Sequence, residues 1–240
     1  MQVRFLSVGD RALAVEFGDR IDRALSSAVL RLAAVIRAER PTGVVETVPT
    51  FRSLLVHYDP LLTSRADLEG VIARLLDRDE GGRARGRLWR IPVCYEGESA
   101  PDLAEVARLT GRAPSEVVAL HCGTRFHVYM LGFLPGFPYL GDLPAALALP
   151  RRADPRVRVP AGSIAIATSL TAIYPYRSPG GWHLIGATPI RCFDAARTPP
   201  ALLAAGDAVL FEPIDADAFA VIRRAIASGG YAIDSEPIAA

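Results

Sequence analysis

The segment from Gly132 to Trp182 constrains the fold of this chain more than any other stretch. It contains three blocks rich in Pro, Gly, Arg and aromatic residues, which read GFLPGFPYLGDLP, PRRADPRVRVPAGS and YPYRSPGGW. Proline fixes φ and has no N–H to donate, whereas glycine allows a positive φ and a close approach of other groups. We therefore exclude a long helix here and predict short strands joined by shaped turns. Loops held this firmly usually carry binding or catalytic residues, although the tight corners of a small barrel would give the same pattern.

Composition excludes several classes of protein. The chain has 240 residues, half of them hydrophobic, and a net charge of +1. This length is enough for one large domain or two ordinary ones, and the charge balance argues against a nucleic-acid binder. The charged first twenty residues and the absence of a long apolar run predict a cytoplasmic protein. Cys94, Cys122 and Cys192 are odd in number and far apart, so we expect reduced thiols.

The chain contains no lysine, because all 27 of its basic residues are arginine. A Walker-type phosphate loop, a Schiff-base enzyme and a covalent biotin site each need a lysine amine, so none of them is possible here. Anions must therefore be bound by arginine or by backbone N–H groups. The sequence also lacks HExxH, GxSxG and any cluster of His and Cys, so we predict no metal site and no hydrolytic triad.

The hydrophobic pattern of the N-terminal third predicts an α/β domain. Alternation and helical periodicity indicate, in order, strands at 3–8 and 12–17, a helix at 21–38, strands at 44–48 and 54–58, and a helix at 67–76. Followed by a strand at 88–95, this is the ferredoxin-like order with one extra strand in front. The charged, Gly-rich stretch 77–87 reads as a linker. We therefore predict a ferredoxin-like α/β domain at 1–85 and a second domain at 86–240.

The second domain is predicted to be mostly strands and turns, which makes the whole chain α+β. Two short helices are expected at 101–110 and 114–120 and a closing helix at 219–228. Between them, strands are expected at 126–131, 163–167, 171–174, 182–187 and 208–213. Many short strands separated by Gly and Pro favour a closed β-barrel.

The arginines of the second block predict an anion site. In an extended chain Arg156 and Arg158 point the same way and would form a two-pronged clamp, with Arg151 just before them. The turns at 162–163 and 180–181 would add backbone N–H donors as an anion nest. The alternative is a solvated basic loop.

The chain has four histidines, His57, His121, His127 and His183. His121 ends a short predicted helix just before the β-region and is the best candidate for a group that exchanges protons. His57 is expected to be structural or solvated, and His127 is the weaker candidate because it lies in a strand with one buried face.

Several blocks of this sequence together resemble a known family. GFLPGFPYLG, PRRxxPRxxVPAGS, IYPxxSPGGWxLIGxTP and the pair at 193–194 are similar to the family called allophanate hydrolase subunit 1. The stretches at 8–18, 43–60 and 199–214 fit it as well, so the resemblance covers nearly the whole chain. That family includes the B component of bacterial ATP-dependent 5-oxoprolinase, the KipI-type inhibitors of a sporulation histidine kinase, and part of the carboxyltransferase region of urea carboxylase.

The resemblance implies a fold, partners and an activity. The fold would be a ferredoxin-like domain followed by a cyclophilin-like β-barrel. The partners would be a companion C subunit of the allophanate hydrolase subunit 2 or KipA type, forming a heterodimer or heterotetramer, and an oxoprolinase A-type protein. The complex would open 5-oxoproline to glutamate with ATP hydrolysis, and its ATP site would be shared with the partner. A non-catalytic KipI-like kinase inhibitor, and amide metabolism of the allophanate hydrolase or urea carboxylase type, stay open as alternatives.

The matching positions give the candidate site. His121 would be catalytic. The residues expected to bind the substrate or another anion are Arg151, Arg156, Arg158, Gly162, Ser163, Gly180 and Gly181. The residues expected to form a cleft and partner surface are Phe133, Pro135, Phe137, Tyr139, Pro160, Tyr174, Pro179 and Trp182. The chain departs from the family pattern at five positions, which leave its substrate open: Ala165, Thr168 and Ala172 in place of glycine, and Leu170 and His183 in place of glutamine.

Overall fold

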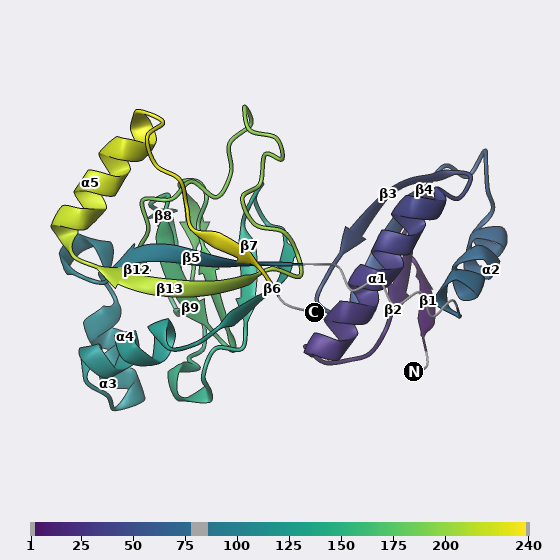
Figure 1. Ribbon diagram of the computed structural model, residues 1–240. Coiled ribbons are helices and arrows are strands. Elements are labelled where there is room, and N and C mark those ends of the chain that lie inside the picture. Colours follow the sequence, from purple (N-terminus) through teal and green to yellow (C-terminus); the bar gives the residue numbers. More distant parts are fainter. Residues whose placement is uncertain (1–2, 78–85, 239–240) are drawn as a thin grey trace. The chain divides into compact units, whose positions relative to one another are not determined.

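The computed structural model of the protein describes residues 3–77 and 86–238. These residues form two compact units, 3–77 and 86–238 (Figure 1). Most of the predicted linker at 77–87 lies outside the described residues.

The first unit is a four-stranded antiparallel sheet with two helices. Its elements are β1 (Arg4–Ser7), β2 (Ala12–Glu16), α1 (Arg23–Glu39), β3 (Val44–Pro49), β4 (Ser53–Tyr58) and α2 (Arg65–Leu76). Both helices start at a side-chain cap, because Asp22 accepts from two N–H groups of the first turn of α1 and Ser64 accepts from Asp67 N in α2. The apolar faces of the helices and strands bury one core, which includes Leu13, Val15, Leu32, Ile36, Leu54 and Ile72.

The sheet order β1-β2-β4-β3 corrects one prediction. The ferredoxin-like order would place the strand that follows α2 beside β2, and the sequence offered 88–95 for that place. In the structure β1 occupies that edge and pairs with β2. The strand expected at 88–95 is β5 (Arg87–Cys94) and belongs to the second unit. There it pairs with all seven residues of β13 (Ala208–Ile214). Alternation identified the strand but not its partner, because pairing depends on long-range contacts.

The second unit is a closed seven-stranded β-barrel. Its strands are β5, β6 (Phe126–Leu131), β7 (Pro138–Gly141), β9 (Ser163–Ala167), β10 (Leu170–Ile173), β12 (His183–Ala187) and β13 (Ala208–Ile214). They pair in the order β12-β9-β10-β7-β6-β13-β5, and a bridge from β12 to β5 closes the ring. The β5–β13 pair is parallel, whereas the other pairs of the ring are antiparallel. The predicted mixed fold with a β-barrel is confirmed.

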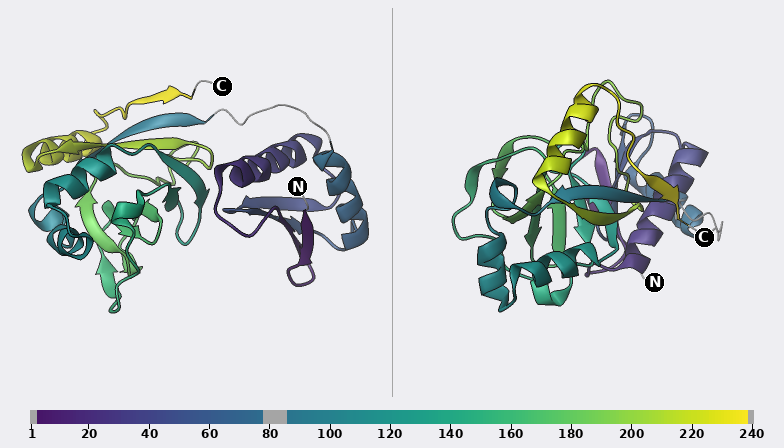
Figure 2. Two further views of the ribbon diagram at one scale, coloured as in Figure 1. Left: turned by 90° about the horizontal axis from the view of Figure 1, so that it is seen from below. Right: turned by 60° about the vertical axis from the view of Figure 1, so that its left-hand side comes forward.

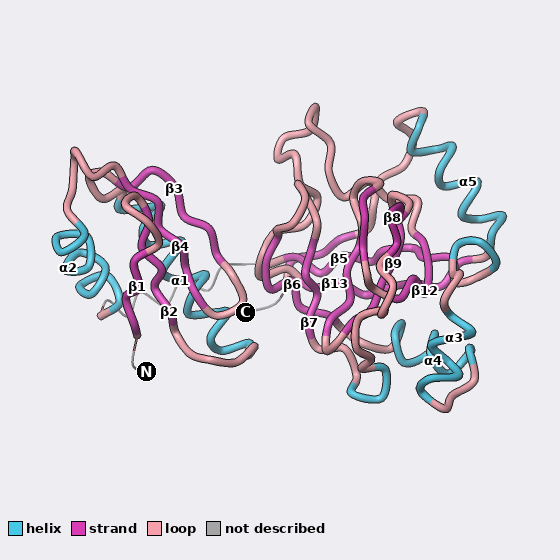
Figure 3. The backbone as a smooth tube through the Cα atoms, turned by 180° about the vertical axis from the view of Figure 1, so that it is seen from behind, coloured by secondary structure: helices cyan, strands magenta, loops and turns pink. Residues whose placement is uncertain are grey.

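The remaining elements surround this barrel. They are a two-stranded ribbon of β8 (Arg156–Val159) and β11 (Ser178–Gly180), the helices α3 (Leu103–Thr110), α4 (Pro114–Cys122) and α5 (Ala216–Ala227), short 3-10 turns at Gly97–Ser99 and Ala145–Leu147, and β14 (Ser235–Pro237). β14 pairs with the beginning of β5. Helices α3 and α4 lie side by side, and α5 lies apart from them (Figures 2 and 3).

The barrel is filled by a second hydrophobic core, which includes Ile91, Phe126, Val128, Leu140, Ile164, Ile166, Ile173 and Phe211. None of the helices in the described ranges has the length and apolar character needed to cross a bilayer. Residues 3–77 and 86–238 likewise contain no group of three or more His, Cys, Asp or Glu placed to hold a metal ion.

Candidate functional site

Five aromatic residues from the Pro- and Gly-rich blocks meet on the barrel unit; we call them the aromatic cluster. Its members are Phe133, Phe137, Tyr139, Tyr174 and Trp182. Phe137 lies at the centre, with ring centroids 5.4 Å from Phe133, 5.0 Å from Tyr139, 5.1 Å from Tyr174 and 6.3 Å from Trp182. These are the distances of tilted and T-shaped aromatic pairs. The structure thus brings together five residues that the sequence assigned to one cleft and partner surface. Phe137, Tyr174 and Trp182 are buried, however, so only Phe133 and Tyr139 keep exposed area.

Phe133 is held in an unusual conformation within this cluster. Its φ is 67°, and Leu134 N–H donates to the carbonyl of Gly132 at 2.8 Å across it, which is a γ-turn. A bulky residue is strained at positive φ and persists there only where its surroundings hold it. A hydrogen bond of 3.1 Å from Gly132 N–H to the carbonyl of Phe137 closes the loop. The turn leaves Phe133 60% exposed and therefore able to contact a ligand or a partner.

Arg151 is the charged residue of this site. It is exposed, and it makes no ion pair or hydrogen bond with the described part of the chain. Burial raises the pKa of Tyr139, and it raises the pKa of Tyr174 to about 12, while the positive charge of Arg151 acts against burial in both. The charge of Arg151 therefore acts on both phenols, and that of Arg156 acts on Tyr174 as well.

Arg156 is bound to Asp102 instead of forming a free clamp with Arg158. Its Nη1 and Nη2 donate to the two carboxylate oxygens of Asp102 at 2.8 and 2.6 Å. Arg152 Nη1 and Leu184 N–H also donate to this carboxylate, at 3.2 and 2.7 Å. Such a bidentate contact takes up the fork of the guanidinium that an anion would need. Arg158 stays exposed on β8.

Asp102 holds Arg152 and Arg156 in place, and the sequence analysis did not identify it. Burial alone would raise its pKa, but the hydrogen bonds from Arg156 and Leu184 N–H and the charges of both arginines outweigh it, so the pKa lies below its ordinary value. Asp102 stands at the start of α3, within the helix that the sequence predicted at 101–110. The side chain makes no cap hydrogen bond and binds the arginine segment to β12 instead.

The predicted anion nest is contradicted at residues 162–163. Gly162 N–H donates to the carbonyl of Tyr174 at 2.7 Å, and Ser163 N–H donates to the carbonyl of Pro160 at 3.4 Å. Both residues are buried. These N–H groups already have backbone acceptors, so they are not open to an anion. The glycine at 162 is required because φ is 84° and a Cβ would lie 2.4 Å from the carbonyl oxygen of Thr188.

Gly180 and Gly181 have different surroundings. A Cβ on Gly180 would lie 2.3 Å from the Tyr174 hydroxyl, whereas one on Gly181 would lie 3.6 Å from its nearest neighbour, Pro155. Gly180 therefore makes room for a member of the aromatic cluster. The three prolines predicted for the same surface, Pro135, Pro160 and Pro179, are all exposed.

His121 lies inside the barrel core. The side chain is fully buried and its ring stacks on Phe211 at 4.7 Å. Thr171 Oγ1 donates to the carbonyl of Ala165, so it accepts from His121 Nε2 at 3.0 Å, and His121 Nδ1 then accepts from the Tyr95 hydroxyl at 2.8 Å. Burial lowers the pKa of His121 to about 3. This environment favours a structural histidine, and the catalytic role stays a prediction.

The other histidines lie elsewhere. His183 is buried, and its Nε2 donates to the carbonyl of Pro150 at 3.0 Å. His57 lies in β4 of the first unit, and His127 contacts the edge of Tyr129 at 4.7 Å.

The departures from the family pattern lie in and around β9 and β10. Ala165 and Ala172 are paired across the two strands and are fully buried, and Leu170 is buried beside them. Thr168, in the turn between the strands, has a φ of 54°, a conformation that favours glycine. These changes alter the wall of the barrel and leave the aromatic cluster intact.

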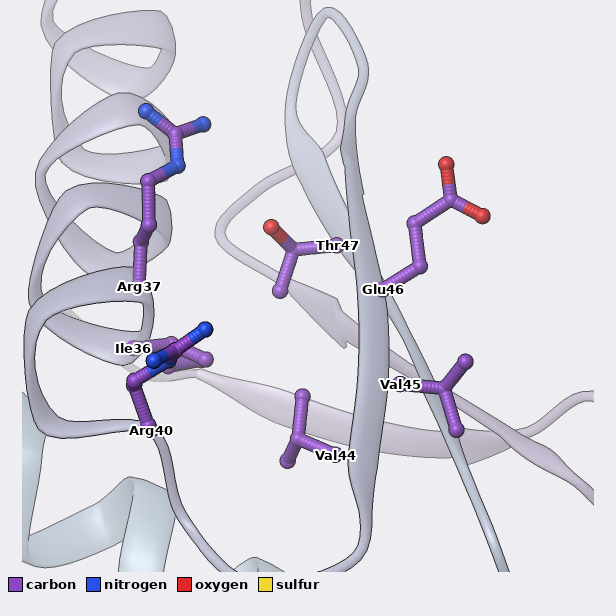
Figure 4. A pocket seen from close by; sticks show the side chains of 7 residues that line it. All are labelled: Ile36, Arg37, Arg40, Val44, Val45, Glu46 and Thr47. Carbon is purple, nitrogen blue, oxygen red and sulfur yellow. The ribbon is translucent and has the colours of Figure 1, made fainter.

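The first unit has a cavity of its own, of about 380 Å³, between α1 and β3. Figure 4 shows Arg37 and Arg40 on the helix, Val44 and Thr47 on the helix side of β3, and Glu46 on the other side. None of the predicted site residues lines this cavity.

Comparison with known proteins gives consistent matches. The sequence profile of the family described as "Carboxyltransferase domain, subdomain C and D" matches residues 3–203. The B component of 5-oxoprolinase from Bacillus subtilis (strain 168) is 40% identical over 227 residues, which cover 88% of this chain and 93% of that protein. These matches confirm the resemblance seen in the sequence.

Two solved structures have the same fold. TTHA0988 matches with a TM-score of 0.76 and 38% identity over 85% of this chain, which spans 40% of the TTHA0988 chain. The K. lactis urea amidolyase matches 98% of this chain with a TM-score of 0.81, over 16% of its own length. Its identity of 21% shows the fold alone.

Proposed function

Because the chain belongs to the family of carboxyltransferase domain subdomains C and D, we propose that it is the B component of an ATP-dependent 5-oxoprolinase-type complex. The B. subtilis relative supports this reading, since it is named as one subunit of a 5-oxoprolinase, which implies partner subunits. The proposed partners are a companion C subunit and an A-type protein. The proposed reaction is the opening of 5-oxoproline to glutamate with ATP hydrolysis.

The observation that carries the proposal is the position of Arg151 beside the aromatic cluster. 5-Oxoproline is a small lactam ring with one carboxylate. In this proposal the guanidinium of Arg151 binds the carboxylate by charge-assisted hydrogen bonds, and the exposed parts of Phe133 and Tyr139 contact the ring. No cysteine, serine or lysine belongs to the cluster, so this chain binds and orients the substrate while reactive groups come from the partner.

The ATP site is assigned to the partner. The chain has no lysine, which excludes a Walker-type phosphate loop, and the N–H groups of Gly162 and Ser163 already have backbone acceptors, so that turn is not open to a phosphate. When bound, ATP would supply the phosphoryl group that activates the lactam. This chain would share that site only through its exposed arginines, Arg151 and Arg158.

The test is 5-oxoproline-dependent ATP hydrolysis by the complex co-purified with its companion subunits. Arg151→Ala should raise KM for 5-oxoproline by roughly 10- to 100-fold, since losing a hydrogen bond to a charged group costs about 1.5–3 kcal/mol. The melting temperature should not change, because the residue is exposed. Arg158→Ala, at a second exposed arginine of the same segment, should change KM for 5-oxoproline less than about threefold, whatever its effect on KM for ATP. Equal KM values for Arg151→Ala and the unmodified complex would contradict the assignment.

A second candidate is a non-catalytic, KipI-like inhibitor of a sensor histidine kinase. The observation that favours it is the exposed Phe133 on a strained turn, which presents an apolar contact to a partner. A complex without 5-oxoproline-dependent turnover, together with inhibition of kinase autophosphorylation that Phe133→Ala abolishes, would support this candidate. Carboxyl transfer of the urea carboxylase type, or allophanate-type amide metabolism, would need a biotin carrier or a catalytic site from elsewhere.

We also propose names for the two folds and a location. The first unit is a ferredoxin-like domain in which β1 replaces the last strand of the motif, and the second is a cyclophilin-like barrel. The complex is placed in the cytoplasm, where the three cysteines, which form no disulfide here, would stay reduced.

A further inference from the structure

The barrel unit has a concave feature that shares no residue with the aromatic cluster. It is a cavity of about 550 Å³, and we call it the α4 pocket. It is lined by Tyr95, Glu96, Leu103, Pro114, Ser115, Val118, Ala119, Cys122, Pro213 and Ile214.

The one parallel strand pair of the ring creates this pocket. β5 and β13 run in the same direction with Cys94 opposite Ile214, so both strands end at the same end of the barrel. Helix α4 packs against β13 and adds the opposite wall. Such a volume lies within the range of small-molecule sites.

The floor and walls of the α4 pocket suit an uncharged, apolar body. Leu103, Val118 and Ile214 contribute hydrocarbon surface. The polar groups of the floor are already paired, because the Cys122 thiol donates to the Tyr95 hydroxyl at 3.5 Å and that hydroxyl donates to His121. A ligand therefore finds few polar groups to satisfy there.

The charge at the rim of the α4 pocket is negative and favours a cationic ligand. Glu96 is the one charged residue among those that line it. Its side chain is exposed and makes no ion pair or hydrogen bond with the residues that the structure describes. The N-terminus of α4, which would otherwise attract anions, is already neutralised by Glu116, whose carboxylate accepts from Ala113 N–H at 2.6 Å. We propose that the α4 pocket binds a small ligand that has an apolar body and a cationic ammonium group.

Calorimetric titration of the whole chain with three probes tests this proposal. Phenylbutylamine, phenylbutanol and phenylbutyrate share one apolar body and differ in charge. The amine should bind about fivefold more tightly than the alcohol, and the carboxylate should bind least. Glu96→Gln should make the amine and the alcohol equal. Glu98→Gln removes a neighbouring carboxylate that does not line the pocket, and it should keep the preference.

Thiol labelling locates the binding site. Cys122 is partly exposed, whereas Cys94 and Cys192 are buried, so a maleimide should label Cys122 first at mildly alkaline pH. Phenylbutylamine should slow this labelling, and Cys122→Ser should remove the fast phase. Ala119→Trp, at an exposed position of α4 that lines the pocket, should abolish binding of all three probes without loss of the fold. Equal affinity for the three probes, no binding, or binding without protection of Cys122 would each overturn the proposal.

Discussion

A chain of hydrogen bonds through His121 connects α4 to the barrel wall. It runs from the Cys122 thiol to the Tyr95 hydroxyl, to the His121 ring, to Thr171 and to the carbonyl of Ala165. Every polar atom of the ring is satisfied, and Phe211 covers one face. A buried network of this kind fixes the relative position of the elements that it joins.

This environment predicts a pH-dependent stability. In the folded protein the pKa of His121 is lowered by burial from 6.5 to about 3. The stabilisation from the neutral ring is therefore complete above pH 6.5 and is lost as the pH falls toward 3, because only the unfolded chain binds the proton in that interval. The free energy of unfolding should drop by about 1.4 kcal/mol per pH unit from this group. Urea unfolding at several pH values measures the slope, and His121→Gln should remove it.

The same variant tests the catalytic prediction for His121. His121→Gln should lower the free energy of unfolding at neutral pH by about 1–3 kcal/mol, because it breaks buried hydrogen bonds. Turnover of the complex should stay within about threefold once folded protein is compared. A loss of about 100-fold in turnover with an unchanged melting temperature would instead establish proton transfer by this residue.

For single residues, the sequence indicated which side chains matter better than it indicated which residues they contact. The aromatic residues do lie together, but three of them are buried, so their role as a cleft and partner surface stays a prediction. The pairing of Arg156 with Asp102 was not visible, because 54 positions separate them. His121 looked like a reactive group because a single sequence does not show that a helix end is buried.

The β8–β11 ribbon shows how one glycine of a pair can be essential and the other replaceable. Gly180→Ala should push the Tyr174 ring out of the aromatic cluster, since its Cβ would lie 2.3 Å from the hydroxyl of a buried side chain. We expect a loss of about 1–3 kcal/mol in the free energy of unfolding and a raised KM for 5-oxoproline. Gly181→Ala, with its nearest contact at 3.6 Å, should change stability by less than about 0.5 kcal/mol. Thermal melts and steady-state kinetics of both variants measure these changes. Equal losses of stability in Gly180→Ala and Gly181→Ala would contradict the packing argument.

The longer elements followed their sequence pattern closely. Helix α1 was expected at 21–38 and spans Arg23–Glu39, and β13 was expected at 208–213 and spans Ala208–Ile214. The short strands β7, β8 and β11, of three or four residues, were not among the strands expected by residue range. In so short a segment proline and glycine outweigh any alternation, and the strand exists because a partner from elsewhere pairs with it.

At the scale of the whole molecule, the two units have separate hydrophobic cores with no residue in common. We therefore expect residues 1–85 and 86–240, expressed as separate proteins, each to unfold in one cooperative thermal transition. Circular dichroism and calorimetry of the two pieces measure this. A piece 86–240 that shows no transition, while the full chain does, would mean that the barrel depends on the first unit.

The position of β5 in the barrel also determines the order in which the two units can fold during synthesis. β5 is the first strand of its unit to leave the ribosome, yet its partners β12, β13 and β14 are all made after residue 182. While they are being synthesised, β5 has open edges and an apolar surface that nothing covers. Residues 3–77 have by then all their strand partners and can fold. The nascent protein thus passes through a stage in which one half is finished and the other waits for its last strands, which is when it is most exposed to aggregation and most in need of a chaperone.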